Sequence, residues 1–330
     1  MAVASERFVK FPPYVSGTSA IWYLIIFGRF ELRHVLVDSD CGVDDALALA
    51  YLVRSTDVEL AGVTTTWGNC TAEEAAANAR HVLDAVGATH VRVASGSQPY
   101  SSWRRGDAHG PDGLGGTESP RPRWTGPTNA VETIIQFARD HAGAGELLCI
   151  GPLTNLSAAL SQEPRLPVLL KRVVVMGGHG ASTSEWLRQV GDTNTRHDPV
   201  ASQHIASSEL PILWIGIDVT RAVLLTNEDF GVGEPGRILR RIHQDYGVSR
   251  GAAYGYDPSD NWRVPAHDGV TASCFVDPVA AGLVAESGQL SVVDESDTGP
   301  ALKVVGPGLH QIATGIDAAA VRTMLRRGTQ

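Results

Sequence analysis

Short apolar runs alternate with helical stretches from residue 34 onward. The runs are rich in Val, Ile and Leu and are mostly continuous, which is typical of strands buried on both faces of a parallel sheet. The expected strands cover residues 34–38, 58–66, 91–95, 146–151, 172–178 and 211–218. The expected helices lie near residues 43–54, 71–87, 128–141, 153–161, 198–208, 235–246, 271–285 and 316–327. This alternation predicts an α/β fold with an open, mostly parallel central sheet and helices on both faces.

Three long segments interrupt this rhythm, over residues 96–127, 179–197 and 247–268. The first holds seven Gly and five Pro. Segments of this length inside a compact domain are usually functional loops or disordered. Two of them directly follow expected strands, and open α/β sheets bind ligands beyond the carboxyl ends of their strands. We therefore expect these segments to build and cover a binding site.

Size and composition agree with a single large domain. The 330 residues are 43% hydrophobic and 19% charged, which supplies a large core and excludes a disordered chain. We expect this domain over residues 34–330, after an N-terminal extension of uncertain role over residues 1–33. Residues 20–28 are apolar, as in a signal peptide, but no small-residue cleavage site follows. We interpret the extension as non-native sequence or a peripheral element, and we expect a cytoplasmic protein.

Charge and cysteine content narrow the range of partners. The net charge of −9 lacks the basic footprint that a phosphate backbone requires, so nucleic acid is not an expected partner. No apolar run reaches the roughly 18 residues of a membrane-spanning helix, so no membrane partner is expected either. The four cysteines are far apart in the sequence, which indicates reduced thiols and neither a zinc site nor a disulfide scaffold.

An acidic cluster directly follows the first expected strand and precedes an apolar helix. Asp38, Asp40, Asp44 and Asp45 fall within eight residues. Carboxylates this close repel one another unless a cation neutralises them, and hard oxygen ligands suit Mg²⁺ or Ca²⁺. Helix capping explains one or two of them but not four. The cluster therefore predicts a metal site.

Three other segments carry polar residues with more than one interpretation. His267 and Asp268 precede an apolar helix, where Asp is commonly a cap, and they matter only if they face the acidic cluster. Asp198 and Pro199 are typical of a helix start, which leaves the nearby Asp192 and Asn194 unexplained. Asn69 ends a strand and could equally cap the next helix or bind a ligand.

Taken together, these motifs resemble the inosine–uridine-preferring nucleoside hydrolases. The family's D-x-D-P-G-x-D-D-A signature corresponds to residues 38–46. Further family motifs follow in order at residues 65–69, 109–110, 151–155, 173–178, 194–199, 216–220 and 267–269. The resemblance covers about residues 34–325, nearly the whole chain.

The resemblance implies hydrolysis of the N-glycosidic bond of purine or pyrimidine ribonucleosides, giving ribose and free base. It also implies a Ca²⁺ ion that binds the attacking water and the ribose hydroxyls, with four ligands: Asp40, Asp45, Asp268 and the backbone carbonyl of Ile150. The leaving base must depart from an oxocarbenium-like ribose, so acid–base help on both sides of the bond is expected.

The same resemblance assigns roles to single residues and implies a homo-oligomer. Asp40 would take the proton of the attacking water, and His267 would protonate the leaving base. The residues that would contact the nucleoside are Asp44, Asn69, Asp192 and Asn194 at the ribose and His109 at the base.

The chain departs from the family pattern at several positions. Cys41 replaces the usual Pro, Gly269 replaces the Pro after His-Asp, and Asp192 replaces a longer Glu. The segment over residues 179–193 is slightly longer than usual. These departures leave the base preference, the sugar and the rate open.

Two alternatives remain at this point. A non-catalytic nucleoside- or metal-binding relative would keep the acidic cluster without turnover. A haloacid-dehalogenase-like phosphatase also begins with a strand and D-x-D, but it requires D-x-D-G-T and a supporting lysine, for which only Lys171 is available.

Overall fold

The computed structural model describes residues 32–96, 98, 102–106, 108–116, 122–179, 191–251, 262–295 and 299–330. Residues Arg33–Gln330 form one compact unit. Apart from its last two positions, the expected extension over residues 1–33 lies outside the described residues, and its role stays a prediction.

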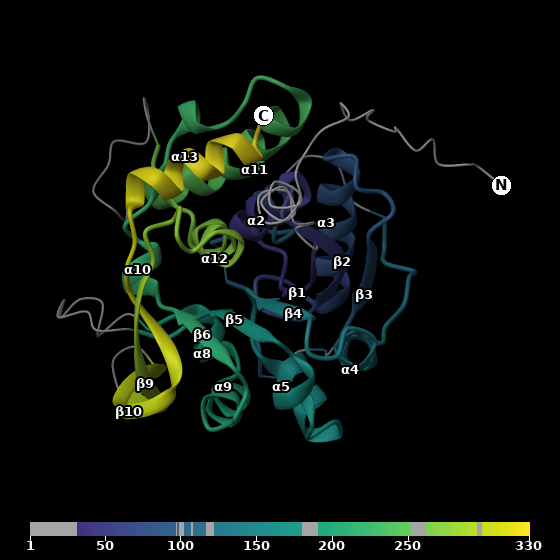
Figure 1. Ribbon diagram of the computed structural model, residues 1–330. Coiled ribbons are helices and arrows are strands. Elements are labelled where there is room, and N and C mark those ends of the chain that lie inside the picture. Colours follow the sequence, from purple (N-terminus) through teal and green to yellow (C-terminus); the bar gives the residue numbers. More distant parts are fainter. Residues whose placement is uncertain are drawn as a thin grey trace, which may run out of the picture. The chain divides into compact units, whose positions relative to one another are not determined.

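The central sheet is open and mostly parallel, as expected. Its strands are β1 (Arg33–Ser39), β2 (Val58–Thr65), β3 (Arg92–Ser95), β4 (Glu146–Cys149), β5 (Arg172–Met176), β6 (Ile212–Ile215), β9 (Val284–Glu295) and β10 (Gly299–Gly315). Their spatial order is β3-β2-β1-β4-β5-β6-β10-β9 (Figure 1). All neighbours run parallel except β9 and β10, which are antiparallel.

The winding of the chain places a binding crevice beside β1. Strands β2 and β3 lie on one side of β1, and β4, β5 and β6 lie on the other. In such sheets, ligands bind beyond the carboxyl ends of the strands at the point where the winding reverses. Here that point is the carboxyl edge between β1 and β4, where Asp38 pairs with Cys149. The acidic segment and Ile150 follow these two strands directly.

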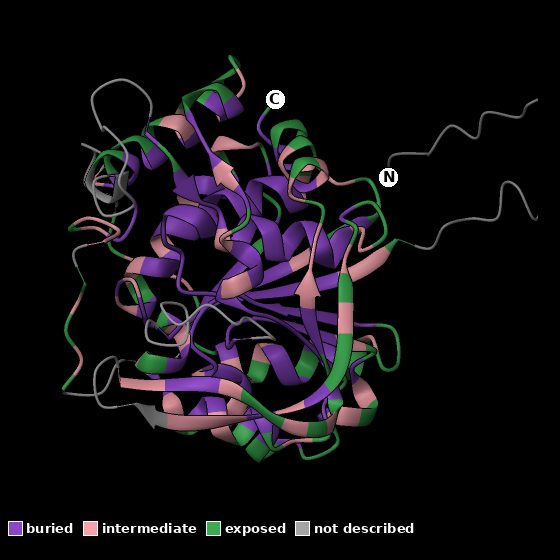
Figure 2. Ribbon diagram, turned by 90° about the vertical axis from the view of Figure 1, so that its left-hand side faces the viewer, coloured by how far each residue is buried: buried purple, intermediate pink, exposed green. Residues whose placement is uncertain are grey.

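The central strands are continuous in apolar residues because both faces of the sheet are covered. Val35 and Val37 of β1 belong to the core on one face, and Leu36 belongs to the core on the other. Leu148 and Leu147 of β4 divide between the two cores in the same way. Figure 2 shows these strands buried over their length, under helices on either side.

Helices cover the two faces of the sheet in separate groups (Figure 1). One face carries α2 (Val43–Arg54), α3 (Ala72–Ala85), α11 (Glu234–Gly251), α12 (His267–Val276) and α13 (Ala318–Gly328). The other carries α4 (Ala130–Asp140), α5 (Thr154–Gln162), α6 (Leu166–Leu169) and α9 (Pro199–Ala206). Short elements complete the described chain: α8 (Thr193–His197), α10 (Ile217–Thr220), a 3₁₀ turn η1 (Asn227–Asp229) and the paired strands β7 (Leu224–Leu225) and β8 (Val264–Pro265). None of the helices in the described ranges is long and apolar enough to cross a membrane.

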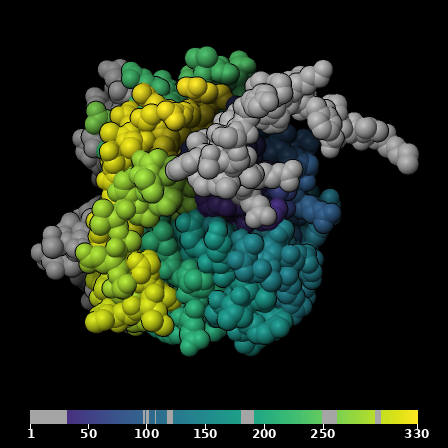
Figure 3. Space-filling model, viewed as in Figure 1, coloured from purple at the N-terminus to yellow at the C-terminus, as the bar shows by residue number. Residues whose placement is uncertain are grey.

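The region after α12 corrects one prediction. The helix expected over residues 271–285 ends at Val276, because Asp277 has left the helical conformation and Pro278 cannot continue a helix. Strands β9 and β10 were not expected at all. In β10, Gly306 interrupts the register and its neighbour Pro307 lacks a backbone donor, which hides the strand from sequence patterns. The β9–β10 pair is only partly buried (Figure 2). The last third of the chain forms one continuous side of the domain (Figure 3).

Candidate active site

The turn after β1 carries the acidic residues, and its backbone is strained at one position. Cys41 adopts a φ of 41°, in the left-handed region that residues other than glycine rarely enter. Its backbone N–H donates to the Ser39 hydroxyl oxygen at 2.9 Å, and that hydroxyl donates to Asp45 Oδ1 at 2.5 Å. Proline, the usual family residue here, is locked near −65° and could not adopt this turn. Gly42 leaves room for two cavity side chains, because a Cβ there would displace those of Asn69 and His109.

Asp38 serves the scaffold and does not line the cavity described below. Its Oδ1 accepts hydrogen bonds from Thr64 Oγ1 at 2.7 Å and from Asn155 Nδ2 at 2.9 Å. Burial raises the pKa of Asp38 to about 6, because its effect is larger than the opposing effect of these two hydrogen bonds. The side chain therefore ties the end of β1 to β2 and α5.

Asp44, Asp45 and Asp268 bring their carboxylate oxygens together at the carboxyl edge. One oxygen of each lies within 4.8 Å of the other two, and all three residues are buried. Asp268 comes from the first turn of α12, while its partners come from the first turn of α2. Asp268 thus faces the acidic cluster. The sequence analysis gave His267 and Asp268 a functional role only on this condition.

Burial and mutual repulsion raise the pKa of these carboxyl groups. Burial, followed by the charge of Asp45, raises the pKa of Asp44 to about 7. The pKa of Asp268 is raised well above its ordinary value by burial and by the charge of Asp44. A cation at this point would remove the repulsion and restore the ionised forms. The donor set consists of hard carboxylate oxygens, so the residues present fit a hard divalent cation.

Helix capping accounts for only part of the acidic cluster. The Asp45 carboxylate accepts a hydrogen bond from the Gly42 backbone N–H at 2.8 Å and so closes the start of α2. The residue that precedes α12 is Ala266, so Asp268 does not cap that helix. Asn69 is not a cap either, because Thr71 caps α3.

Asp40 has one oxygen fixed and one without a partner. Its Oδ2 accepts a hydrogen bond from the Asn69 backbone N–H at 2.7 Å. Its Oδ1 is buried and has no hydrogen-bond partner among the described residues. Burial, followed by the charge of Asp45, raises the pKa of Asp40 well above its ordinary value. Such an atom calls for a cation or a donor from a ligand.

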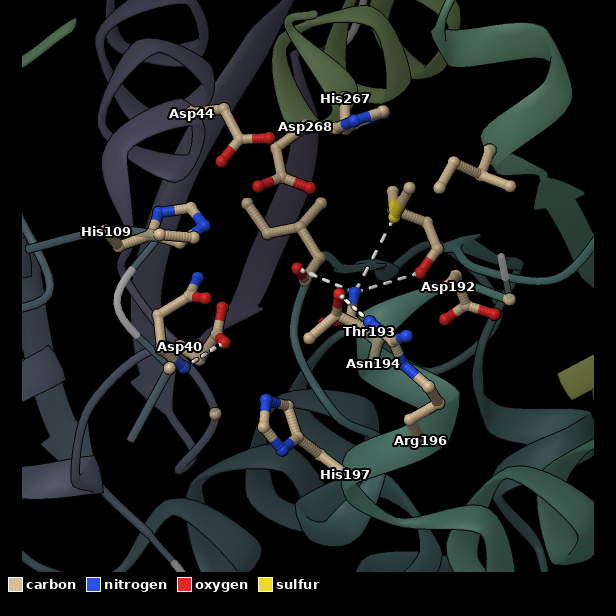
Figure 4. Close-up of a pocket in the computed structure, with 18 of the residues that line it drawn as sticks. Asp40, Asp44, His109, Asp192, Thr193, Asn194, Arg196, His197, His267 and Asp268 are labelled. Atoms are coloured by element: carbon tan, nitrogen blue, oxygen red, sulfur yellow. Dashed lines mark hydrogen bonds between the residues drawn. The ribbon is translucent and has the colours of Figure 1, made fainter. Parts of the chain in front are cut away.

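A cavity of about 400 Å³ opens onto these groups (Figure 4). Its lining contains every residue to which the family resemblance gave a role except Asp45, namely Asp40, Asp44, Asn69, His109, Ile150, Asp192, Asn194, His267 and Asp268. Asp44 and Asp268 lie at one end with His267, and Asn194 and His197 lie farther along (Figure 4). The volume is in the range of small-molecule sites.

Asn194 and Ile150 are joined by a hydrogen bond. The Asn194 side-chain N–H₂ donates to the carbonyls of Ile150 and Met176, each at 3.2 Å. A carbonyl oxygen has two lone pairs, so Ile150 retains one for another partner. The amide oxygen of Asn194 remains available to accept from a hydroxyl.

Asp192 has a role in the scaffold that the sequence left unexplained. Its carboxylate accepts from the backbone N–H of Gly178 at 2.9 Å and of Thr195 at 2.8 Å. Asp192 therefore caps α8 and joins it to the segment after β5. The sequence analysis expected a long loop over residues 179–197. Residues 193–197 of this segment form a short helix instead, and residues 180–190 lie outside the described part.

Two histidines at the site are held by neighbouring groups. His109 Nδ1 accepts a hydrogen bond from the Val43 backbone N–H at 3.0 Å, so the neutral ring carries its proton on Nε2. His267 Nδ1 lies 2.6 Å from Thr220 Oγ1. Burial, with a further contribution from Arg221, lowers the pKa of His267 to about 3, so its imidazole is neutral at pH 7.

The cavity also contains residues that sequence reasoning missed, namely Arg104, Thr193, Arg196, His197, Arg221 and Tyr246. Arg196 and His197 lie inside the segment that the sequence singled out, but nothing in their spacing distinguished them. Tyr246 packs with its ring centroid 5.0 Å from that of His109. Only the fold brings these side chains to one cavity.

Lys171 removes the support for the phosphatase alternative. Its Nζ lies 3.2 Å from Glu146 Oε1, next to the start of β5. The acidic cluster lies at the other ends of the strands, so Lys171 cannot assist it.

Comparisons with known sequences agree with this geometry. The family model described as inosine-uridine preferring nucleoside hydrolase matches residues 35–323. A probable uridine nucleosidase 2 of Oryza sativa subsp. japonica is 30% identical over 255 residues, which is 74% of this chain and 74% of that protein. A pyrimidine-specific ribonucleoside hydrolase of Photobacterium profundum is 33% identical over 201 residues, which is 60% of this chain and 64% of that one.

Solved structures show the same architecture. A plant nucleoside hydrolase superimposes with a TM-score of 0.78 at 25% identity, covering 90% of this chain and 99% of that one. A purine-preferring ribonucleoside hydrolase from Gardnerella vaginalis gives 0.76 at 25% identity, covering 90% and 98%. The fold, the ordered motifs and the family match lead to one conclusion. The chain belongs to the inosine-uridine preferring nucleoside hydrolase family and is an enzyme of that class.

Proposed function

We propose that this protein is a Ca²⁺-dependent ribonucleoside hydrolase that cleaves the N-glycosidic bond to give ribose and free base. The observation that carries the proposal is the buried cluster of Asp44, Asp45 and Asp268. Two of its members, Asp44 and Asp268, line one cavity together with Asp40, whose Oδ1 has no hydrogen-bond partner among the described residues. This arrangement is costly in a protein unless a cation and a polar ligand complete it.

The metal site is proposed as the sequence assigned it, with Asp40, Asp45, Asp268 and the Ile150 carbonyl as ligands. When bound, a divalent cation supplies positive charge that holds oxygen ligands and makes water more acidic. Ca²⁺ suits this donor set because it accepts several carboxylate and carbonyl oxygens in flexible geometry. Asp44 lies close enough to share in binding the cation or to accept from a ribose hydroxyl.

Asp40 is the proposed general base. The Asn69 backbone N–H fixes Oδ2, which leaves Oδ1 directed to no protein partner among the described residues. An ionised Asp40 can therefore accept the proton of the attacking water at Oδ1. The raised pKa of the metal-free carboxyl makes this ionisation depend on the cation, so activity and metal binding are coupled.

His267 is the proposed group at the leaving base. Its Nδ1 contacts Thr220, which leaves Nε2 for the substrate. The low pKa of His267 means that the free enzyme holds a neutral imidazole, which assists by donating a hydrogen bond when Nε2 carries the proton. Transfer of a proton to the base requires His267 to take one from solvent first, which the negative charge developing on the leaving group favours; the imidazole then gives this proton to the base and is neutral again.

The remaining cavity residues are proposed to bind the nucleoside. Asp44, Asn69 and Asn194 would bind the ribose hydroxyls and His109 would contact the base; all four residues line the cavity. Asp192 already accepts two backbone hydrogen bonds, so any contact with the ribose uses its remaining lone pairs. The relatives are named for uridine, pyrimidine and purine substrates, so the base preference is left to experiment.

The decisive experiment measures ribose release from inosine, uridine, cytidine, adenosine and guanosine. Each nucleoside is incubated with the protein in Ca²⁺ and, separately, in excess chelator. We expect release in Ca²⁺ and its loss with chelator, restored by adding Ca²⁺ back. A folded, Ca²⁺-loaded protein that releases no ribose from any of the five would refute the proposal and favour a binding-only relative.

Assembly and location are proposed on the resemblance alone. We expect a homo-oligomer, which light scattering after size-exclusion chromatography measures directly. We also propose a cytoplasmic enzyme, and fractionation of the source cells tests this location.

A further inference from the structure

A second buried charge cluster lies at the amino edge of the sheet, at the opposite ends of the strands from the active site. Glu146 begins β4, Arg33 begins β1 and Arg172 begins β5, and these three strands are neighbours. Only 2% of the Glu146 side chain is exposed. Together with Lys171, these residues are called the Glu146 cluster below.

Both arginines bind Glu146 through two nitrogens. Arg33 Nε donates to Glu146 Oε1 at 3.1 Å, and its Nη2 donates to Oε2 at 2.8 Å. Arg172 donates to Oε2 from Nε at 3.1 Å and from Nη2 at 2.7 Å. The Arg33 pair is bidentate, whereas both nitrogens of Arg172 share one oxygen, and two donors from each arginine restrict the orientation of its guanidinium plane.

The fixed guanidinium groups hold the end of α12. Arg33 donates to the carbonyls of Val276 at 2.7 Å and Phe275 at 2.9 Å, and Arg172 donates to that of Phe275 at 2.8 Å. These carbonyls are in the last turn of the helix, where they have no partner within the helix. The Phe275 ring also lies under both guanidinium groups, 5.1 Å from Arg33 and 4.6 Å from Arg172. The cluster therefore binds both the backbone and the side chain of one residue.

The other end of α12 carries His267 and Asp268. The helix of 10 residues is about 15 Å long and behaves as a rigid rod at this length. A Cβ at Gly269 would come within 3.1 Å of Leu47 on α2 and of Leu325 on α13, so the glycine lets α12 pack closely on both helices. Polar contacts hold α12 at both ends: Arg33 and Arg172 bind its last turn, and Thr220 Oγ1 lies 2.6 Å from His267 Nδ1 at its first turn.

We propose that Arg33, Glu146 and Arg172 are positioning residues for the active site, which hold α12 along its axis and so place Asp268 and His267 against α2. The inference rests on the proposed function, because it assigns these two residues to the metal and the leaving base. Loss of the Glu146 charge frees both guanidinium groups, weakens their bonds to Phe275 and Val276, and lets the helix shift. Asp268 then moves relative to Asp44 and Asp45.

A matched control exists elsewhere in the fold. Asp229 is also a buried carboxylate, with 1% of its side chain exposed, and it is held by Arg322 and Arg326. These contacts join η1 to α13, and none of the three residues lines the cavity. Asp229→Asn therefore removes a comparable cluster without touching α12 directly.

The test compares wild type, Glu146→Gln and Asp229→Asn by Ca²⁺ calorimetry, thermal melting and nucleoside hydrolysis. We expect both variants to melt earlier by similar amounts. Glu146→Gln is expected to bind Ca²⁺ about tenfold more weakly and to lose kcat more than it raises KM, as for other residues behind metal ligands. Asp229→Asn is expected to keep Ca²⁺ affinity and kcat within about twofold of wild type.

A milder variant guards against failure to fold. Arg172→Lys keeps the charge but loses the planar group that binds Glu146 and the Phe275 carbonyl together, and we expect an intermediate loss of Ca²⁺ affinity. Equal Ca²⁺ affinity and kcat in the Glu146 and Asp229 variants would overturn the proposal, as would an unchanged Glu146→Gln protein. Wild type that binds Ca²⁺ but releases no ribose refutes only the proposed reaction, because Ca²⁺ affinity is measured without turnover.

Discussion

Buried carboxylates occur at both edges of the central sheet, but their partners differ. At the amino edge Glu146 is paired with Arg33 and Arg172, which outweigh burial and hold its pKa below the ordinary value. At the carboxyl edge Asp44, Asp45 and Asp268 cluster with one another, and the pKa of each is raised. The first edge is complete without a ligand. The second edge is the proposed cation site, and this difference separates a scaffold cluster from a candidate functional one.

Asp40→Asn gives the largest expected effect. The change removes the proposed base, so we expect kcat to fall on the order of 10³-fold. It also removes a buried carboxylate with an unpartnered oxygen, so the metal-free protein should melt no earlier than wild type. Ribose release and thermal melting in chelator measure the two effects. Wild-type turnover in the variant would contradict the role of Asp40, and a large fall in metal-free stability would contradict the comparison of the two edges.

His267→Ala is expected to lower kcat on the order of 10²-fold, because one hydrogen bond to the leaving base is lost. A nucleoside analogue with a better leaving group should be affected less, since it needs less help at the base. Because the pKa of His267 is about 3, its own titration should not appear near pH 6.5 in the pH dependence of kcat/KM. A wild-type ionisation near pH 6.5 that disappears in the variant would contradict the neutral imidazole.

Stability should respond to Ca²⁺ more strongly at high pH. The pKa of Asp44, beside the proposed cation, is raised to about 7, so the metal-free folded state binds more protons there than the unfolded chain. The stability from this group is present below about pH 4 and is lost as pH rises through about 7. Saturating Ca²⁺ should therefore raise the Tm by roughly 5 °C or more at pH 7 and by less at pH 5. Scanning calorimetry with Ca²⁺ or chelator at each pH measures this, and an equal rise at both would contradict it.

Cys41 gives the smallest expected effect. Cys41→Gly relieves a left-handed φ but also removes a buried side chain, so the two effects oppose each other and the free energy of unfolding should change by less than about 1 kcal/mol, measured by denaturant unfolding. Cys41→Pro restores the usual family residue but cannot adopt this φ, so it should destabilise the turn and weaken Ca²⁺ binding. A fully active, equally stable proline variant would show that the turn has another accessible conformation.

The parts of the site that follow strands were predictable, whereas the parts that depend on long-range packing were not. Asp40 and Asp44 follow β1 in the sequence, so local spacing was sufficient to associate them with a metal. His267 and Asp268 gave a weak signal, because only the packing of α12 on α2 shows that they face the cluster. The capping role of Asp192 and the arginines around the cavity had no signal in the spacing.

The sequence by itself determined the six central strands, the helices on both faces and the acidic turn after β1. Continuous apolar runs and a local excess of carboxylates are properties of neighbouring residues, so they can be read along the chain. Tertiary structure alone decided the β9–β10 pair, in which Gly306 and Pro307 conceal the strand pattern. It also decided the contact of Glu146 with the end of α12 and the meeting of Asp268 with Asp44. These contacts join segments far apart in sequence, and their geometry is set by packing over the whole sheet.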